Sequence, residues 1–111
     1  MISFNREAFY TAVYDIVAQI PAGRACSYGA IAKAIGYPQH SRMVGQAMKT
    51  CPKNLPAYRV VNNQGMLSAK DCFEYPEKMQ QLLEAEDILI SNDRIKDWKK
   101  VFWNPMEEIT F

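Results

Sequence analysis

The chain has 111 residues, of which 49% are hydrophobic; this is enough for a buried core and excludes an intrinsically disordered chain. Its 13 basic and 12 acidic residues give a net charge of +1, which excludes the strongly basic composition of many nucleic-acid binders. We expect residues 1–111 to form one domain. No apolar run is long enough to span a bilayer and no signal peptide is visible, so we expect a cytoplasmic location.

The charged residues are distributed unevenly along the chain. No aspartate or glutamate occurs between Gly23 and Asn63. The basic residues of this stretch are Arg24, Lys33, Arg42, Lys49, Lys53 and Arg59. Because local charge matters more than total charge in nucleic-acid binding, the pattern indicates one positive face, with a chance gap in the acidic residues as the alternative.

Cysteine and histidine are too few for an ordinary metal site. The cysteines Cys26, Cys51 and Cys72 have no metal-type spacing, and His40 is the single histidine. We therefore expect no metal and no cofactor. An odd number of cysteines also indicates a reducing compartment, in agreement with a cytoplasmic location.

Apolar periodicity predicts three helices in the first half of the chain. Over residues 4–20, apolar residues recur at three- and four-residue steps, and Pro21 ends the helix. Ser27 is suited to cap a second helix that stops at Gly36. Ser41 is suited to cap a third helix.

The second and third helices, with a short connection between them, form a helix-turn-helix candidate. In that arrangement the N-terminal end of the second helix of the motif approaches DNA, and its unpaired backbone N–H groups can bind phosphate. Gly45 lies on the outer face of this helix, where glycine costs about 1 kcal/mol against alanine. Close approach to a nucleic-acid backbone and tight packing against another helix explain this glycine equally well.

Elements of the second half give weaker signals. Residues 58–61 favour a short strand, and residues 62–65, Asn-Asn-Gln-Gly, predict a turn. Pro76 is suited to the first turn of a helix that runs to about Glu86. We expect the aromatic side chains near the C-terminus to cover the core. These elements together predict a mostly α fold with a short strand or hairpin element.

Several motifs occur in an order that resembles a known family. They are residues 21–24 (Pro-Ala-Gly-Arg) with 27–29 (Ser-Tyr-Gly), residues 41–48 (Ser-Arg-Met-Val-Gly-Gln-Ala-Met), residues 56–61 (Pro-Ala-Tyr-Arg-Val-Val) and residues 82–86 (Leu-Leu-Glu-Ala-Glu). The set resembles the C-terminal DNA-binding domain of the O6-alkylguanine-DNA alkyltransferases, whose active-site motif reads Pro-Cys-His-Arg-Val. Ala57 stands in place of the cysteine and Tyr58 in place of the histidine. The match is closest to the alkyltransferase-like proteins, which also lack that cysteine.

This resemblance implies a winged helix-turn-helix-like domain of the alkyltransferase C-terminal type, which binds double-stranded DNA carrying O6-alkylguanine. It implies that the damaged nucleotide is flipped into a pocket and marked for nucleotide excision repair. No alkyl group is transferred, because a thiolate is the nucleophile of the alkyltransferases and Ala57 has none. We expect a monomer that is not an enzyme and binds no membrane, with damaged DNA and nucleotide excision repair proteins as its partners.

The family's motifs also imply roles for individual residues. Flipping unstacks a base at a cost of a few kcal/mol. Arg42 matches the arginine finger that fills the resulting gap, and Tyr28 matches the tyrosine that presses on the phosphate beside the flipped nucleotide. Their ordinary alternatives are a solvated phosphate contact for Arg42 and a buried capping aromatic for Tyr28. The other expected DNA contacts are Ser41, Gly45 and Gln46. The expected lesion pocket comprises Pro56, Ala57, Tyr58, Arg59, Val60, Met66 and Ser68.

The chain departs from the family at two further points. Glu86 matches the glutamate of the alkyltransferase relay, but Tyr58 replaces the histidine, so we expect a Tyr58–Glu86 hydrogen bond as a structural remnant. Met66 stands where many of the sensors have an arginine, and its thioether packs against a ring less specifically. Because Ala57 is small, we expect the pocket to tolerate large O6-adducts.

Two other functions fit parts of the pattern. A helix-turn-helix regulator would read base edges with Gln46 and Lys49, but such regulators usually bind as dimers and no dimerisation helix is evident. A degenerate homologue that binds only a protein partner is the third possibility.

Overall fold

The computed structural model describes residues 4–109 as short helices and very short strands. In the first half of the chain the helices are α1 (Arg6–Val17), α2 (Tyr28–Ile35) and α3 (Ser41–Lys49). The second half holds the 3-10 helices η1 (Ala57–Arg59) and η2 (Lys70–Cys72) and the helices α4 (Lys78–Glu84), α5 (Trp98–Val101) and α6 (Pro105–Glu108). The strands are β1 (Cys26–Ser27), β2 (Val60–Val61), β3 (Ile90–Ser91) and β4 (Arg94–Ile95).

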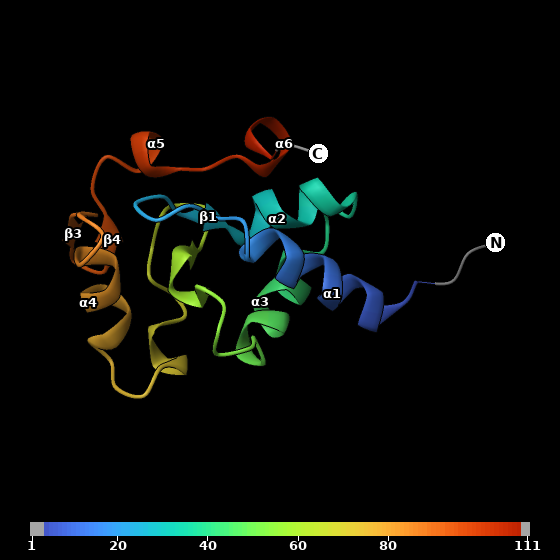
Figure 1. Cartoon of the computed structure of the whole chain (residues 1–111), viewed down its shortest axis with the longest axis horizontal. Helices are drawn as coiled ribbons and strands as arrows, with labels where there is room; N and C mark the ends of the chain where they lie inside the picture. Colours follow the sequence, from blue (N-terminus) through green and yellow to red (C-terminus); the bar gives the residue numbers. More distant parts are fainter. Residues whose placement is uncertain (1–3, 110–111) are drawn as a thin grey trace.

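The two halves of the chain form two groups of elements (Figure 1). Helices α1, α2 and α3 lie together on one side, and α4 lies on the other with the antiparallel pair β3–β4. The parallel pair β1–β2 lies between the groups, with Cys26 opposite Val60. The C-terminal segment runs back toward the first group, where the Trp103 N–H donates to the Ala25 carbonyl at 2.8 Å.

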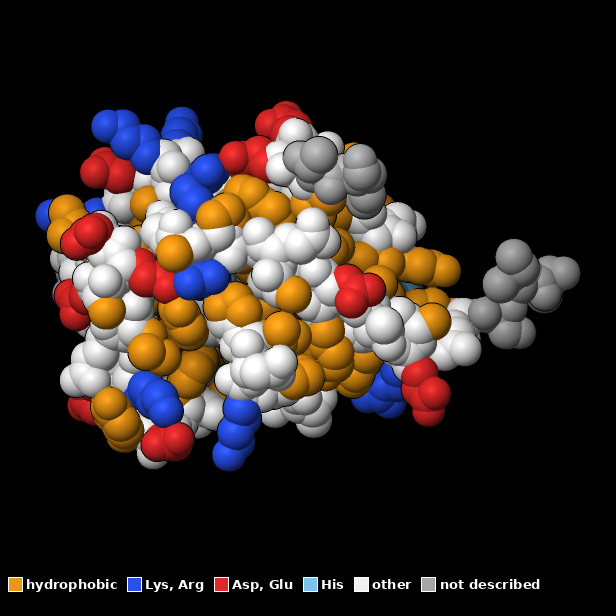
Figure 2. Space-filling model, in the orientation of Figure 1, with side chains coloured by type: hydrophobic (Ala, Val, Ile, Leu, Met, Phe, Trp, Pro, Cys, Tyr) orange, Lys and Arg blue, Asp and Glu red, His pale blue; other side chains and the backbone are white. Residues whose placement is uncertain are grey.

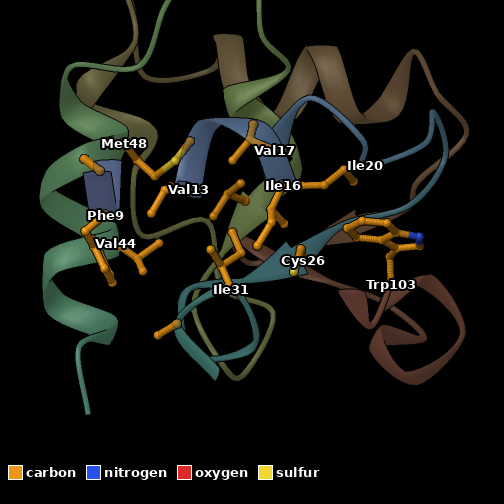
Figure 3. Packing of buried hydrophobic residues seen from close by; sticks show 13 residues of the cluster. Phe9, Val13, Ile16, Val17, Ile20, Cys26, Ile31, Val44, Met48 and Trp103 are labelled. Atoms are coloured by element: carbon orange, nitrogen blue, oxygen red, sulfur yellow. The ribbon is translucent and has the colours of Figure 1, made fainter. Parts of the chain in front are cut away.

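Strand β2 connects two buried clusters. Successive side chains of a strand point to opposite faces. Val60 packs into a cluster formed by α1, α2 and α3 together with Trp103, part of which is shown in Figure 3. Val61 packs into a second cluster around α4, with Met79 and Leu83. The position of η1, directly before β2, is therefore fixed relative to both halves.

Local sequence signals explain the ends of the first two helices. The Asn5 side chain accepts from the Ala8 N–H at 3.1 Å, so α1 begins later than position 4, and it ends before the expected position 20. As predicted, Ser27 caps α2 by accepting from the Ala30 N–H at 3.1 Å, and Gly36 ends it in the left-handed region at φ +98°.

Three expectations for other elements are wrong. Ser41 is the first residue of α3 and does not cap it; His40 is the N-cap residue, without a side-chain hydrogen bond. Tyr58 belongs to a 3-10 helix and not to a strand, which is limited to the two valines. Helix α4 begins at Lys78, so Pro76 lies before its first turn.

The position of the hairpin, at β3–β4, was not predicted, although the sequence contains a signal for it. Its two turn residues, Asn92 and Asp93, have φ values of +52° and +60°. Asparagine and aspartate tolerate this region better than other residues with a side chain, and tight hairpin turns require it. The observed architecture confirms a mostly α fold with short strand and hairpin elements. Within residues 4–109, no helix is long and apolar enough to cross a membrane.

Replacing Ser27 by alanine will lower the free energy of unfolding by about 1 kcal/mol, because α2 loses its side-chain cap. Ser41→Ala is the matched control and will change it by less than about 0.5 kcal/mol, since Ser41 is not a cap. Urea denaturation measures both values. Equal losses in the two variants would contradict the assignment of the cap.

Candidate nucleic-acid interface

A cavity of about 730 Å³ lies between the two halves of the molecule. Its walls come from α2, α3, the loop that follows α3, η1, the segment from Ser68 to Glu74, and α4. Many of the predicted site residues line it: Tyr28, Arg42, Gly45, Gln46, Ala57, Tyr58, Val60 and Ser68. The structure thus brings residues from both predicted sets, for DNA contact and for the lesion pocket, to one space.

A smaller hollow of about 280 Å³ adjoins this cavity. It is lined by Ser41 of α3 and by the turn residues Asn62, Asn63 and Gln64, which the sequence analysis did not assign to the site. Tyr28, Arg42 and Gly45 line both spaces. These three residues therefore form the border between the cavity and the hollow.

The two most important predicted side chains differ in their surroundings. Tyr28 is the first residue of α2 and is partly buried, and its hydroxyl accepts from Ser68 Oγ at 3.4 Å. Burial raises the pKa of Tyr28, so the phenol stays neutral. Arg42 is exposed on the first turn of α3, and its guanidinium has no hydrogen bond or ion pair with any residue from 4 to 109. The Arg42 side chain is therefore free to contact a ligand.

The exposed face of α3 is open around Gly45. A Cβ atom on Gly45 would have no neighbouring atom within 4 Å beyond the helix itself, in the part of the chain that the structure describes. Packing against another helix therefore does not explain the glycine at position 45. Of the two explanations that the sequence allows, close approach of an outside molecule is the one left. The first turn of α3 contains no acidic residue and no side-chain cap. The Met43 N–H donates to the His40 carbonyl at 3.0 Å, whereas the Ser41 and Arg42 N–H groups have no partner within residues 4–109 and are available to an anion.

Contacts from several segments hold the Asn62–Gly65 turn that borders the hollow. Asn62 Oδ1 accepts from the Gln64 and Met66 N–H groups at 3.0 and 2.9 Å. Asn63 Oδ1 accepts from the Gly29 N–H at 3.1 Å, and a Cβ on Gly29 would lie only 2.7 Å from this oxygen. Glycine at position 29 therefore lets the turn approach the start of α2 closely.

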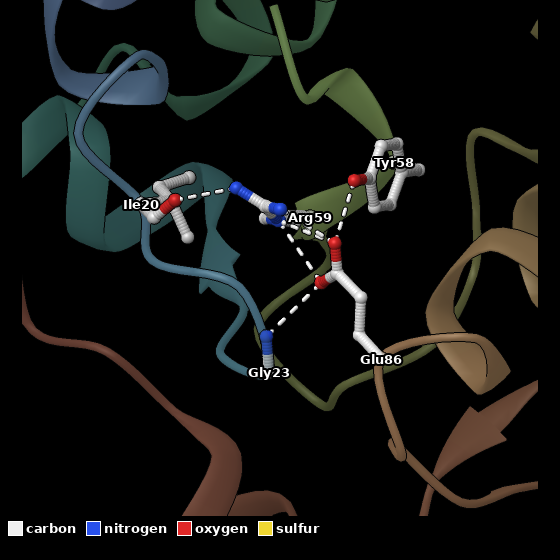
Figure 4. Close-up of polar contacts among 5 residues, drawn as sticks. All are labelled: Ile20, Gly23, Tyr58, Arg59 and Glu86. Atoms are coloured by element: carbon white, nitrogen blue, oxygen red, sulfur yellow. Dashed lines mark hydrogen bonds and ion pairs between the residues drawn. The ribbon is translucent and has the colours of Figure 1, made fainter.

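The Glu86 carboxylate joins three segments beside the cavity (Figure 4). It accepts from the Gly23 N–H at 3.0 Å, from the Tyr58 hydroxyl at 2.6 Å and from Arg59 Nε at 3.0 Å, and it forms an ion pair with Arg59 Nη2. Arg59 Nη1 also donates to the Ile20 carbonyl at 2.7 Å. The predicted Tyr58–Glu86 hydrogen bond is confirmed, as part of a larger network.

Charge interactions keep Glu86 ionised. The Arg59 and Glu86 side chains are only 15% and 14% exposed. Burial alone would raise the pKa of Glu86, but hydrogen bonds from Arg59, Tyr58 and Gly23 lower it below its ordinary value. Burial and the bond to Glu86 raise the pKa of Tyr58, so its hydroxyl remains a donor.

Some predicted pocket residues do not line the cavity. Pro56 precedes η1 as its N-cap residue, and Arg59 turns toward Glu86. Met66 pairs through its backbone with Arg94 and Asn62 and lies outside the cavity lining. Met66, which follows the Asn62–Gly65 turn, thus takes part in an isolated β-bridge with Arg94.

Two cysteines line the cavity, which the sequence did not reveal. Cys51, in the loop after α3, and Cys72, at the end of η2, are both part of the lining. Burial raises the pKa of the Cys51 thiol. Cys26 is fully buried in the first cluster, and burial raises its pKa to about 12. A high pKa reduces the thiolate fraction and with it nucleophilicity.

Most of the charged residues that line the cavity are basic. Arg42, Lys49, Lys53 and Lys78 line it together with one acidic residue, Glu74. Figure 2 shows a face on which acidic and basic side chains are interspersed, so this face is not the positive face that the sequence indicates. No group of histidine, cysteine, aspartate or glutamate residues within the described range 4–109 could hold a metal ion.

The helix-turn-helix and the cavity beside it define a DNA-binding domain of the alkyltransferase type. The family described as "6-O-methylguanine DNA methyltransferase, DNA binding domain" matches residues 8–88. The chain is 35% identical to alkyltransferase-like protein 1 of Schizosaccharomyces pombe over 105 residues, which cover 89% of this chain and 97% of that protein. It is 37% identical to a DNA base-flipping protein of Vibrio parahaemolyticus, with 89% and 99% covered. The chain therefore belongs to the alkyltransferase-like branch of this family.

Solved structures show the same relationship. The structure of S. pombe Atl1 in complex with damaged DNA containing O6-carboxymethylguanine superimposes with a TM-score of 0.80 at 35% identity, covering 92% of this chain and all of that chain. A Mycobacterium tuberculosis OGT structure in complex with DNA gives a TM-score of 0.61 at 33% identity and covers 70% of this chain and 48% of that chain. These similarities confirm the alkyltransferase type of fold.

Replacing Gly45 by alanine will separate stability from DNA binding. The substitution will raise the free energy of unfolding by up to about 1 kcal/mol, because alanine favours the helix and the site has room. We expect it to lower affinity for DNA, because the predicted close approach of the nucleic-acid backbone to α3 leaves no room for the new methyl group. Urea denaturation and a DNA titration measure the two effects. A variant that is more stable and binds DNA unchanged would contradict the close approach.

Removing the charge of Glu86 will destabilise the fold. Glu86→Gln will lower the free energy of unfolding by about 3 kcal/mol, because Arg59 is left as a poorly compensated, largely buried charge. The matched control Glu84→Gln removes an exposed charge two residues earlier and will cost less than about 0.5 kcal/mol. Chemical denaturation at neutral pH measures both losses.

The pH dependence gives a second test of the same interaction. Because the folded-state pKa of Glu86 is lowered, its contribution is fully present above the ordinary carboxyl pKa of about 4.3 and is lost as the pH falls through the lowered value. The difference in stability between wild type and Glu86→Gln will therefore shrink below about pH 4. A difference that stays constant into this acidic range would show that the carboxylate charge is not responsible.

Proposed function

We propose that this protein binds double-stranded DNA that carries an O6-alkylguanine, flips the damaged nucleotide into the cavity beside α3, and holds it there without transferring the alkyl group. The bound complex then marks the lesion for nucleotide excision repair. Membership of the alkyltransferase-like branch and the DNA complexes of its relatives support DNA-lesion binding.

The observation that carries this proposal is the position of Tyr28, Arg42 and Gly45 between the cavity and the adjoining hollow. A flipped nucleotide must pass from the duplex into a closed space while another group takes its place in the stack. Arg42 is unpaired within residues 4–109 and stands at this border, so its guanidinium plane can fill the stack. Tyr28 stands beside it, where its neutral hydroxyl can contact the neighbouring phosphate.

The residue at the family's nucleophile position supports binding without alkyl transfer. Ala57 lines the cavity at the family's nucleophile position and has no group that can accept an alkyl chain. Tyr58 donates its hydroxyl proton to Glu86 in a hydrogen bond, and Glu86 is also held by Arg59. The remaining polar groups of the family relay therefore bind one another and serve the fold.

Recognition by a protein without chemistry requires a partner that performs the repair. We propose that the protein acts as a monomer on DNA, since the cavity and its border come from one chain. Nucleotide excision repair proteins would then recognise the protein–DNA complex. Co-purification of a repair factor with the complex, and not with either component alone, tests this step.

A binding titration tests the proposed function. At fixed salt, the protein will bind a duplex with one O6-alkylguanine more tightly than the same duplex with guanine. Arg42→Ala will reduce the affinity for the damaged duplex roughly tenfold and will remove most of the preference, because the gap left by the flipped base is no longer filled. The control Lys33→Ala removes one exposed charge from α2, away from the cavity, and will weaken binding to both duplexes equally.

Equal affinity of the wild type for both duplexes would contradict lesion recognition. An Arg42→Ala protein that keeps the full preference would contradict the role of Arg42 while leaving lesion recognition intact.

The size of the cavity supports tolerance of large adducts. The lining of this space of about 730 Å³ includes the small Ala57 side chain together with Leu55, Phe73 and Leu82. Affinity will therefore stay constant or rise from O6-methylguanine to a bulky apolar adduct, as apolar surface is buried. The same titration with an adduct series checks this, and tighter binding of O6-methylguanine than of the bulky adduct would contradict it.

A further inference from the structure

The Asn62–Gly65 turn, which borders the hollow, is held by the chain from Asp93 to Trp98. The carbonyl oxygens of three consecutive turn residues each accept a hydrogen bond from this chain. The pairs are Asn63 with Trp98 Nε1 at 3.3 Å, Gln64 with Arg94 Nε at 2.9 Å, and Gly65 with the Ile95 N–H at 2.9 Å. We call residues 93–98, which include β4 and the first residue of α5, the supporting segment.

The supporting segment also holds the chain that follows the turn. The Leu67 N–H donates to the Asp93 carbonyl at 2.8 Å, and Lys70 Nζ pairs with Asp93 Oδ2 at 2.7 Å. Ser68, whose hydroxyl bonds to Tyr28, lies between these two anchors in the sequence. Residues 63–70 are therefore fixed to the supporting segment at both ends of the stretch.

The Trp98 ring packs directly on the backbone of the turn. A Cβ atom on Gly65 would lie 3.0 Å from Trp98 Cδ2, and Gly65 has a φ of +79°, so this position requires glycine. Trp98 is half-buried and also packs against the second cluster, the one around α4. The ring therefore connects the turn to the packed core of the α4 half of the molecule.

Asn63 links the supporting segment to the start of α2. Its carbonyl accepts from Trp98, and its Oδ1 accepts from the N–H of Gly29 at 3.1 Å. Gly29 is the residue next to Tyr28. The hollow is lined by Tyr28 and Arg42 from the first half of the chain and by residues of the turn from the second half. The shape of the hollow therefore depends on where Trp98 holds the turn.

We propose that Trp98 is a positioning residue for DNA binding, which holds the Asn62–Gly65 turn where α2, α3 and the turn can contact the nucleic acid together. Trp98 lines neither the cavity nor the hollow, so its effect passes through the turn. This inference rests on the proposed function, because it requires DNA to bind at the cavity and the hollow. The family match ends at residue 88, so this support comes from a part of the chain beyond that match.

A DNA titration of folded variants tests the role of Trp98. Trp98→Ala will weaken binding of an O6-methylguanine duplex by about fivefold and will lower the preference over the unmodified duplex, because the turn is no longer held. The matched control Val101→Ala removes apolar contacts with the same cluster from the same helix, and its apolar side chain cannot hydrogen-bond the turn. This control will lower the stability but leave both affinities at the wild-type value. Urea denaturation gives the folded fraction by which each affinity is corrected.

A double-mutant cycle tests whether Trp98 acts through the turn. Asn63→Ala removes the side chain that joins the turn to α2. In this background Trp98→Ala will cost less affinity than in the wild type, because the turn is already released and residues of one network are coupled. If the alanine variant does not fold, Trp98→Leu replaces it in the titration and in the cycle, since leucine fills part of the core space but lacks both the ring and the N–H donor.

The outcomes separate this inference from the proposed function. If the wild type binds the damaged and unmodified duplexes equally, the proposed function fails and this inference fails with it. If the wild type prefers the damaged duplex but Trp98→Ala, corrected for its folded fraction, binds as the wild type does, lesion recognition stands and the positioning role is overturned. The positioning role is also overturned if the losses in affinity multiply in the double variant, or if Val101→Ala weakens binding as much as Trp98→Ala.

Discussion

The Glu86 carboxylate, which lies just after α4, accepts hydrogen bonds from three residues that are distant in sequence: Gly23, Tyr58 and Arg59. It accepts from the turn after α1 through Gly23 and from η1 through Tyr58 and Arg59, and Arg59 in turn reaches the Ile20 carbonyl. Ala57 is the first residue of η1. The position of the cavity wall at Ala57 therefore depends on an ion pair that lies largely out of solvent.

The same groups support the proposal that the site recognises a base without reacting with it. In an alkyltransferase the corresponding motif contains a cysteine and a histidine, and the resemblance assigns Glu86 to the relay behind them. Here alanine and tyrosine occupy these positions, and the tyrosine is held by Glu86 at 2.6 Å. The network stabilises the wall of the cavity, while Tyr28 and Arg42 lie at the border between the cavity and the adjoining hollow. In the proposed function, the residues that stabilise the cavity wall therefore differ from those that contact DNA.

The sequence predicted the parts of this arrangement that depend on local chemistry. Ser27 begins α2 and Gly36 ends it, as expected, because a capping side chain or a left-handed glycine affects only the few residues next to it. Ser41 has the same chemistry, but His40 takes the N-cap position, so residue type alone did not identify the cap. The Asn92–Asp93 turn was readable in principle from its tolerance of positive φ.

Other features depend on contacts between distant segments and could not be predicted from local patterns. Cys51 and Cys72 line the same cavity because the loop after α3 and η2 both contribute to its wall. Met66 is drawn into backbone pairing with Arg94, away from the cavity. The contribution of Asn63 to the border appears only once its side chain is seen to bind the Gly29 N–H.

The central claim is that the protein holds an alkylated guanine without removing the alkyl group. The most direct measurement uses a duplex with a radiolabelled methyl group on the O6 atom of one guanine, incubated with excess protein until binding is complete and then denatured and separated. We expect the protein to be bound to the duplex before denaturation, and all of the label to be found on the DNA after denaturation. Label on the protein, at Cys51, Cys72 or any other residue, would contradict the account.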